Sequence, residues 1–149
     1  MSARQRRKVP GLLVISHGRL AEELVASART ILGDVDGMAA ISIGWDDDAD
    51  EARGRIEAAI RELDRGRGVL VLTDMFGGTP TNLALSAHDA GKIEIVTGVN
   101  LPMLIKFTGM RDGTDLASFS QAIAGQGREA IQVAGQLLGR DNDEGGDPA

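Results

Sequence analysis

Leu12-Leu13-Val14-Ile15-Ser16-His17-Gly18 is the stretch of the chain that decides its fold. Its four consecutive apolar residues predict a short strand buried on both faces, as in a parallel sheet that helices cover on both sides. His17 follows this strand, and in α/β proteins the residues beyond the carboxyl ends of the strands line the ligand-binding edge of the sheet. A histidine at that place can act as a base, bind a metal or form a covalent bond.

Predicted strands and helices alternate along the rest of the chain. Apolar runs indicate further strands over residues 38–43, 69–73 and 93–97. After the first strand, helical spacing predicts a helix over residues 19–32, whose apolar stripe comprises Leu20, Leu24, Ala28 and Ile31. This alternation is typical of an α/β fold, namely a doubly wound, mostly parallel sheet of about four strands with helices on both faces.

Polar capping residues indicate where the later helices begin. The three aspartates at 46–48 crowd the start of one helix, where the helix dipole favours negative charge. Thr79 is expected to cap the next helix, and Asn100 and Asp115 to cap two more. Residues 128–138 are ambiguous, because apolar residues alternate as in a strand while their spacing also suits a helix.

Composition limits the class of protein. With 149 residues, 42% of them hydrophobic, the chain is long enough for one domain with a sizeable core. We expect that domain over residues 11–140, between a flexible basic arm at 1–10 and a disordered acidic tail at 141–149. The net charge of −6 argues against nucleic acid as a partner, and there is no cysteine for disulfides or thiolate chemistry. No apolar segment is long enough to insert into a membrane, so a cytoplasmic protein is expected.

A second loop carries polar residues after a predicted strand. Asp74-Met75-Phe76-Gly77-Gly78-Thr79-Pro80-Thr81-Asn82 follows residues 69–73. Because the first and third strands of such sheets are often neighbours, we expect His17 and Asp74 at the same edge. The Asp74 carboxylate would there accept a hydrogen bond from the Nδ1–H group of His17. This tautomer leaves Nε2 with a free lone pair. Backbone N–H groups of the Gly77-Gly78-Thr79 segment, at a helix start, would bind an anion.

Together these features indicate phosphoryl transfer through a phosphohistidine, although each has an ordinary alternative as a loop histidine, a capping aspartate or a glycine turn. A metal site is not expected, because His17 and His88 are far apart and cysteine is absent. Motifs of P-loop, dinucleotide-binding and serine-hydrolase sites are also absent. His88 is given no role, and Trp45 is expected either in the core or on a partner surface.

The chain resembles enzyme IIA of the mannose family, from the bacterial sugar phosphotransferase system. The resemblance rests on Ser16-His17-Gly18, on the loop from Asp74 to Asn82, and on Gly98-Val99-Asn100-Leu101-Pro102-Met103-Leu104. It implies a phosphotransferase in which His17 accepts a phosphoryl group from the histidine-containing phosphocarrier protein and passes it to a histidine of a IIB partner, without a cofactor. Asp74 matches the carboxylate that hydrogen-bonds the active histidine. The residues expected beside the phosphate are Gly18, Gly77, Gly78 and Thr79.

The resemblance also implies a homodimer whose subunits exchange an antiparallel C-terminal strand, which favours a fifth strand over residues 131–135. The IIB partner, part of a membrane-associated complex, is expected as a separate chain. Two alternatives stay open. One is a regulatory module whose phosphorylation state a partner detects. The other is the phosphocarrier subunit of a dihydroxyacetone kinase, which is less favoured because that subunit has serine in place of Gly18 and lacks the Gly-Gly-Thr-Pro loop.

Overall fold

A computed structural model describes residues 7–144 and, from residue 140 onward, only the course of the backbone. It confirms the doubly wound sheet. Four parallel strands lie in the order β2-β1-β3-β4. Their bounds, which for the last three match the predicted ranges, are β1 (Gly11–His17), β2 (Met38–Ile43), β3 (Val69–Thr73) and β4 (Ile93–Thr97).

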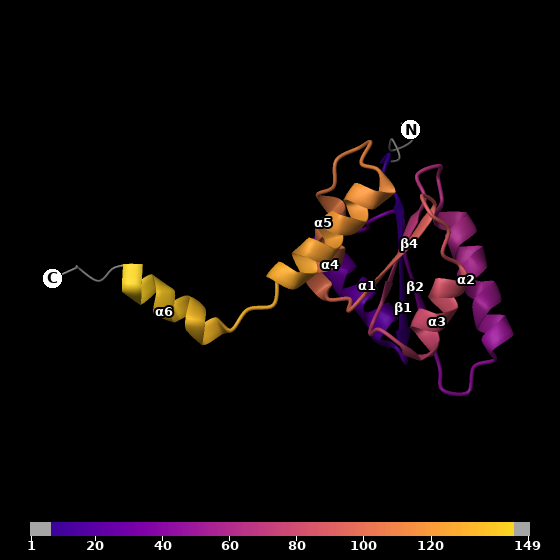
Figure 1. Ribbon diagram of the computed structural model, residues 1–149, viewed down its shortest axis with the longest axis horizontal. Coiled ribbons are helices and arrows are strands. Elements are labelled where there is room, and N and C mark those ends of the chain that lie inside the picture. The colour runs from indigo at the N-terminus through magenta and orange to yellow at the C-terminus, as the bar shows by residue number, and fades with distance from the viewer. Residues whose placement is uncertain (1–6, 145–149) are drawn as a thin grey trace.

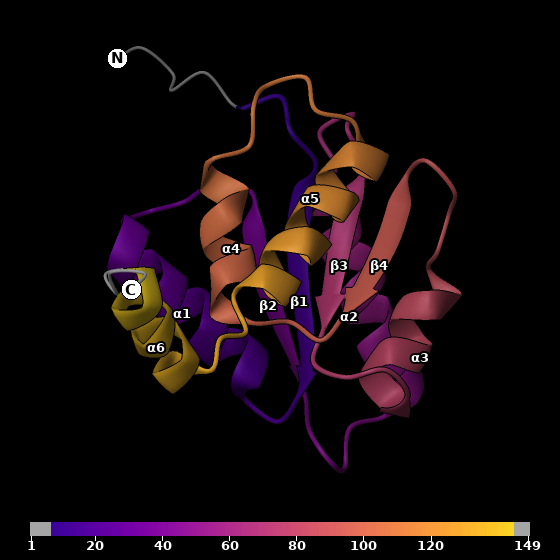
Figure 2. The same cartoon turned by 60° about the vertical axis from the view of Figure 1, so that its left-hand side comes forward.

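Helices cover both faces of the sheet (Figure 1). One face carries α1 (Leu20–Leu32), α4 (Leu101–Thr108) and α5 (Leu116–Glu129), as Figure 2 also shows. The other carries α2 (Ala49–Leu63) and α3 (Gly78–Ser86). Within the described residues, no helix combines the length and the apolar character needed to span a membrane.

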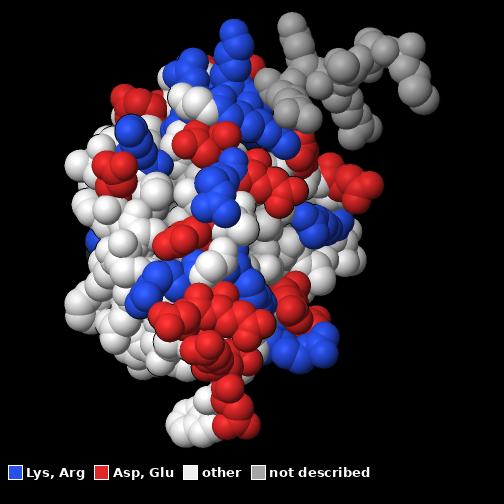
Figure 3. All heavy atoms as spheres, turned by 90° about the vertical axis from the view of Figure 1, so that its right-hand side faces the viewer, with Lys and Arg blue, Asp and Glu red and all other residues white. Residues whose placement is uncertain are grey.

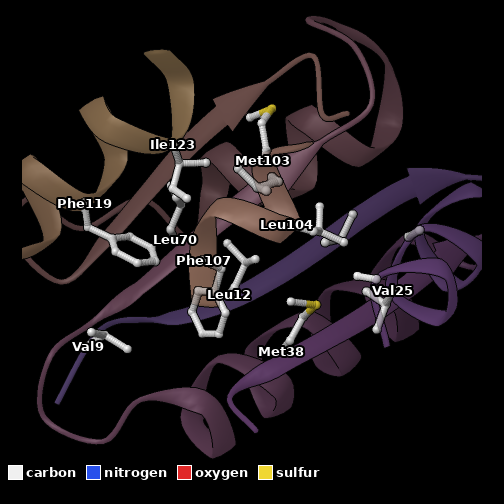
Figure 4. Close-up of a cluster of buried hydrophobic side chains, with 14 of the residues drawn as sticks. Val9, Leu12, Val25, Met38, Leu70, Met103, Leu104, Phe107, Phe119 and Ile123 are labelled. Carbon is white, nitrogen blue, oxygen red and sulfur yellow. The ribbon is translucent and has the colours of Figure 1, made fainter. Parts of the chain in front are cut away.

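The two helical layers enclose separate hydrophobic cores because side chains alternate across each strand. From β1, Leu12 and Val14 enter the first core, whereas Leu13 and Ile15 enter the second. Phe107 and Phe119 meet edge to face in the first core, with ring centroids 5.8 Å apart. Figure 4 shows this core between the sheet and its three helices. Both faces of β1 are therefore dry, and its end is held firmly.

Two details of the helices differ from the prediction. In α1 the buried residues are Ala21, Val25 and Ala28. Leu24 of the predicted stripe packs half-buried against the first core, while Leu20 and Ile31 are exposed. The stripe is rotated by about one residue, because small side chains let this helix pack close to the sheet. The helix α3 begins at Gly78 with Gly77 as its cap, before Thr79.

The flexible arm predicted over residues 1–10 is wrong for its last part. The Arg7 guanidinium donates to the carbonyl oxygens of Phe107 (3.1 Å) and Met110 (2.6 Å) and lies over the Phe107 ring. Val9 is buried in the first core. Apolar burial and carbonyl acceptors at the end of α4 therefore fix this segment, which charge patterning alone could not reveal. Residues 1–6 lie outside the described residues.

The C-terminal segment also departs from expectation. Residues 131–133 form no regular structure, and helix α6 (Ala134–Glu144) extends away from the body of the molecule (Figure 1). The fifth strand expected over residues 131–135 is thus not formed in the single chain, where it has no partner for its backbone groups. The first four residues of the expected disordered tail are helical, because a helix satisfies its backbone bonds internally. Residues 145–149 lie outside the described residues.

Candidate functional site

The parallel pairing of β1 with β3 brings the two predicted side chains together. His17 ends β1, Asp74 follows β3, and Ile15 is paired with Thr73. The His17 Nδ1 atom lies 2.7 Å from the Asp74 Oδ2 atom. The imidazole is 45% exposed and the carboxylate 12% exposed, so the ring faces solvent and the aspartate lies behind it. The predicted juxtaposition of His17 and Asp74 is confirmed.

Asp74 is held as an ionised acceptor. Burial alone would raise the pKa of its carboxyl, but hydrogen bonds from the His17 backbone N–H (2.9 Å), the His17 ring and the Met75 N–H (3.0 Å) outweigh burial and lower that pKa below its usual range. Since an ionised carboxylate only accepts hydrogen bonds, Nδ1 must carry the proton of the neutral imidazole. Nε2 then presents an unprotonated lone pair to solvent.

The glycine loop approaches the free edge of the imidazole. A Cβ atom at position 78 would lie 3.1 Å from the His17 Nε2 atom and 3.0 Å from Cε1. Gly77 and Gly78 both have positive φ, +85° and +78°, which L side chains rarely adopt. Glycine at position 78 therefore leaves open the space beside the atom that carries the lone pair.

The same loop leads into the N-terminus of α3. The N–H groups in the first turn of a helix have no partner inside that helix, and the helix dipole favours an anion there. Gly78 and Thr79 supply the first N–H groups, whereas Pro80 has none. Thr79 is exposed and its side chain caps nothing. An anion beside Nε2 would thus meet backbone donors on a surface without obstructing side chains.

Gly18 has a different part in the site. Its N–H donates to the carbonyl oxygen of Ile43 at 3.0 Å, so this donor is already engaged. Its φ of +53° turns the chain from β1 into α1. The structure gives Gly18 a role in shaping the turn behind His17, and its predicted contact with phosphate stays a prediction.

Three buried hydroxyl groups, those of Ser16, Thr73 and Thr81, brace the site, and the sequence patterns predict a role for none of them. Ser16 Oγ accepts from the Ala21 N–H (2.7 Å) and donates to the His17 carbonyl oxygen (3.0 Å), which ties His17 to the start of α1. Thr81 donates to the Met75 carbonyl oxygen (2.5 Å) and accepts from Thr73 (2.8 Å). The sequence signal that could have found them is a serine or threonine at a position that the predicted packing buries.

Large apolar side chains stand exposed around His17. Trp45 is 98% exposed, so its alternative placement in the core is wrong. Phe76 and Met75, in the loop after Asp74, are 79% and 56% exposed. Trp45 follows β2, whose last residue is paired with His17, so all three lie at the same edge of the sheet. We call Trp45, Met75 and Phe76 the apolar rim.

The other histidine lies apart from this site. His88 follows α3, half-exposed, with its Nε2 atom 3.8 Å from a Glu94 oxygen. Among the side chains that the structure describes, those of residues 7–139, no three of histidine, cysteine, aspartate or glutamate are grouped so that they could hold a metal ion.

Comparison with known proteins assigns the family. A family model for the fructose IIA component of the sugar phosphotransferase system, EIIA-man, matches residues 11–141. The chain belongs to this IIA family. The dihydroxyacetone-kinase alternative is thereby set aside, and this chain is a component of the mannose and fructose type.

Two curated relatives show how this IIA domain compares in length. It is 32% identical over 126 residues to the mannose-specific EIIAB component of Escherichia coli (strain K12), a match that covers 82% of the chain but only 38% of that relative. The fructose-specific EIIA component of Bacillus subtilis is 26% identical over 129 residues, with 85% of this chain and 88% of that protein covered. The chain thus corresponds to roughly two fifths of the first relative and to most of the second.

Solved IIA structures share the fold. The mannose/sorbose-specific IIA subunit from Enterococcus faecalis superimposes with a TM-score of 0.74 at 29% identity, covering 84% of this chain and 94% of that one. The IIA protein associated with the fucose utilization operon of Streptococcus pneumoniae gives a TM-score of 0.75 at 27% identity, covering 89% and 99%.

The lowered pKa of Asp74 predicts how its contribution to stability depends on pH. Because the unfolded chain binds this proton at higher pH than the folded chain, the contribution is complete well above the ordinary value of 3.8 and is lost as the pH falls through the folded-state pKa. The difference in unfolding free energy between the wild type and Asp74→Asn should therefore shrink between neutral pH and about pH 3.

Urea unfolding followed by circular dichroism measures this difference. Asp46→Asn is the matched control, because Asp46 lies in the β2–α2 loop and its carboxylate has no hydrogen bond or ion pair within the described part of the chain. A stability difference for Asp74→Asn that grows toward acid would contradict the assignment.

Proposed function

We propose that this IIA domain carries a phosphoryl group on His17 Nε2 between two protein partners. The observation that carries the proposal is the 2.7 Å contact between Nδ1 and the Asp74 carboxylate. It directs the ring's lone pair outward, beside the opening that Gly78 leaves. A nucleophile, an orienting carboxylate and an anion site are the groups that phosphoryl transfer requires.

The transfer is an in-line displacement at phosphorus. The Nε2 lone pair forms the new N–P bond, the N–P bond of the donor phosphohistidine breaks, and its electron pair returns to the donor nitrogen. Positive charge grows on the His17 ring, and the ionised Asp74 offsets it while holding the Nδ1 proton. Backbone N–H groups of Gly78 and Thr79 bind the phosphoryl oxygens. The onward step runs in the opposite sense, with His17 as the leaving group.

The apolar rim favours a protein as the reaction partner. Monomeric proteins rarely expose a tryptophan, a phenylalanine and a methionine together, and such groups mark surfaces that bind other proteins. We propose the histidine-containing phosphocarrier protein as donor and a separate IIB protein as acceptor, the partners that the family resemblance implies. The name EIIAB of the Escherichia coli relative also joins a IIA to a IIB unit.

Phosphorylation by phosphoenolpyruvate, enzyme I and the phosphocarrier protein tests the chemistry. The wild type should gain one acid-labile, base-stable phosphate that maps to His17, and His17→Ala should gain none. Asp74→Asn should fold but react more slowly by on the order of 100-fold, the usual effect of losing one preorganised group.

His88→Ala is the matched control, since it removes the chain's other histidine away from the site, and it should be phosphorylated at the wild-type rate. Label retained by His17→Ala would overturn the proposal. A normal rate in Asp74→Asn would remove the carboxylate from the mechanism.

The rim predicts a separable effect on docking. Trp45→Ala should raise the phosphocarrier concentration needed for half-maximal rate by on the order of tenfold, because exposed aromatic residues anchor interfaces. The rate at saturation should stay unchanged, since Trp45 is almost fully exposed and takes no part in the hydrogen bonds that hold His17 and Asp74. Initial rates against carrier concentration measure both values. Ile31→Ala, an exposed apolar change at the far end of α1, should alter neither, and an equal effect of both variants would contradict the docking role.

A homodimer completes the sheet in our proposal. β4 is an edge strand, and unpaired edge backbone invites a strand from another chain. A hollow beside it is lined by Glu94, Ile95, Val96, Thr97, Ala117, Ser120, Gln121, Ala124 and Arg128. Ile131 and Val133 follow α5 and are 77% and 63% exposed, which leaves apolar side chains uncovered in the single chain. We propose that residues 131–133 of a second copy pair with β4.

Sedimentation equilibrium tests this dimer. Val133→Pro removes a backbone N–H from the exchanged strand and should shift the protein from dimer to monomer. Leu138→Pro makes the same change in α6, beyond the strand, and should leave the dimer intact. A wild-type monomer at all concentrations examined, or a dimer in both variants, would refute strand exchange.

A further inference from the structure

A second cavity lies at the end of the sheet opposite His17. Its volume is about 350 Å³, within the range of small-molecule sites. It opens among the segment before β1, the ends of α1 and α2, and the end of α4. Its apolar lining comprises Val9, Pro10, Leu32, Val35, Leu63 and Phe107.

A cationic hollow adjoins this apolar cavity. It measures about 380 Å³ and is lined by Arg7, Lys8, Arg65 and Arg67. Arg7 and Arg65 line both spaces, so the two are neighbours with a shared boundary. Figure 3 shows Lys and Arg side chains gathered at the upper end of the molecule, where the strands begin. The net charge of the whole chain is −6, so a hollow lined by four cationic side chains differs in charge from the rest of the molecule.

The four cations are not equally free. The Arg7 guanidinium is committed to two carbonyl oxygens, and Arg65 forms a forked pair with Asp36 at 2.8 and 3.0 Å. The side chains of Lys8 and Arg67 form no ion pair or hydrogen bond with any residue that the structure describes. Arg7 and Arg65 therefore form fixed walls, while Lys8 and Arg67 keep their donors for an anion.

We propose that the two spaces together bind a small phosphorylated molecule with a flat apolar body. The body enters the apolar cavity beside Leu32 and Val35, and the phosphate is bound by Lys8 and Arg67 at the cationic hollow. A guanidinium matches two phosphate oxygens at once, and an ammonium adds a compact charge. Asp34, which also lines the apolar cavity, offers an acceptor to a donor group on the body.

This site is separate from the phosphoryl site. Gly11 lines the cavity at the beginning of β1, and His17 ends the same strand. Strand geometry puts about 20 Å between the two ends. The inference does not rest on the proposed chemistry of His17, so its test uses binding alone.

Calorimetric titration of the full chain with 4-methylumbelliferyl phosphate, an aromatic phosphate ester, tests the site. We expect saturable 1:1 binding that weakens as salt screens the charges. Arg67→Glu and Lys8→Glu should each weaken it at least tenfold. Leu32→Trp should do the same by filling the apolar cavity, since Leu32 belongs to neither hydrophobic core. Both inorganic phosphate and uncharged 4-methylumbelliferone should bind more weakly than the ester.

Matched controls separate this site from general charge and from the phosphoryl site. Arg53→Glu makes the same charge change at an exposed position of α2 that lines neither space, and it should bind the ester like the wild type. His17→Ala should also bind it normally, even if the proposed transfer were wrong. Circular dichroism confirms that each variant is folded. No saturable binding, or equal affinities in Arg67→Glu and Arg53→Glu, would overturn the proposal, as would unchanged affinity in Leu32→Trp.

Discussion

The parallel pairing of β1 with β3 is the constraint on which the site depends. It brings together two residues that are 57 positions apart in the sequence, so that Nδ1 of His17 forms a hydrogen bond with Oδ2 of Asp74. That bond fixes the tautomer, and the tautomer fixes which nitrogen can react. The dry cores on both faces of β1 hold the strand end that carries the ring. Packing far from the reacting atom therefore determines its chemistry.

In the loop after β3, the backbone conformation of the glycines and the hydrogen bonds of buried side chains have different roles. Gly78 allows a close approach to the imidazole, and Gly77 supplies the positive φ with which the loop turns into α3. The buried hydroxyl groups of Thr73 and Thr81, on either side of the loop, bond to each other, and Thr81 also donates to the Met75 carbonyl oxygen in the loop. The flexibility that glycine brings to the unfolded chain is thus countered by buried hydrogen bonds in the folded one.

Much of this could be predicted from the sequence, because parallel strands buried on both faces are continuous apolar runs. The bounds of β3, which is buried along its whole length, follow from that property. Those of β2 and β4, which are only partly buried, follow from shorter apolar runs, and the proximity of His17 to Asp74 follows from the expected pairing of the first and third strands. The errors have a common cause in contacts between distant segments. The stripe of α1 depends on how closely a helix approaches the sheet, and the segment around Arg7 depends on carbonyl oxygens a hundred residues away. Residues 131–133 are exposed and pair with no strand of the part of the chain that the structure describes, so nothing within one chain makes them a strand.

The single tryptophan has a spectroscopic consequence. Trp45 is almost fully solvated in the folded chain, and there is no tyrosine. Its indole is exposed to water before and after unfolding, so the wavelength of its emission maximum should change little when the domain denatures. A protein that covers the edge of the sheet would instead move the same indole from water into an apolar contact. The wavelength of the intrinsic fluorescence thus reports little about unfolding and responds mainly to the binding of a partner at the apolar rim.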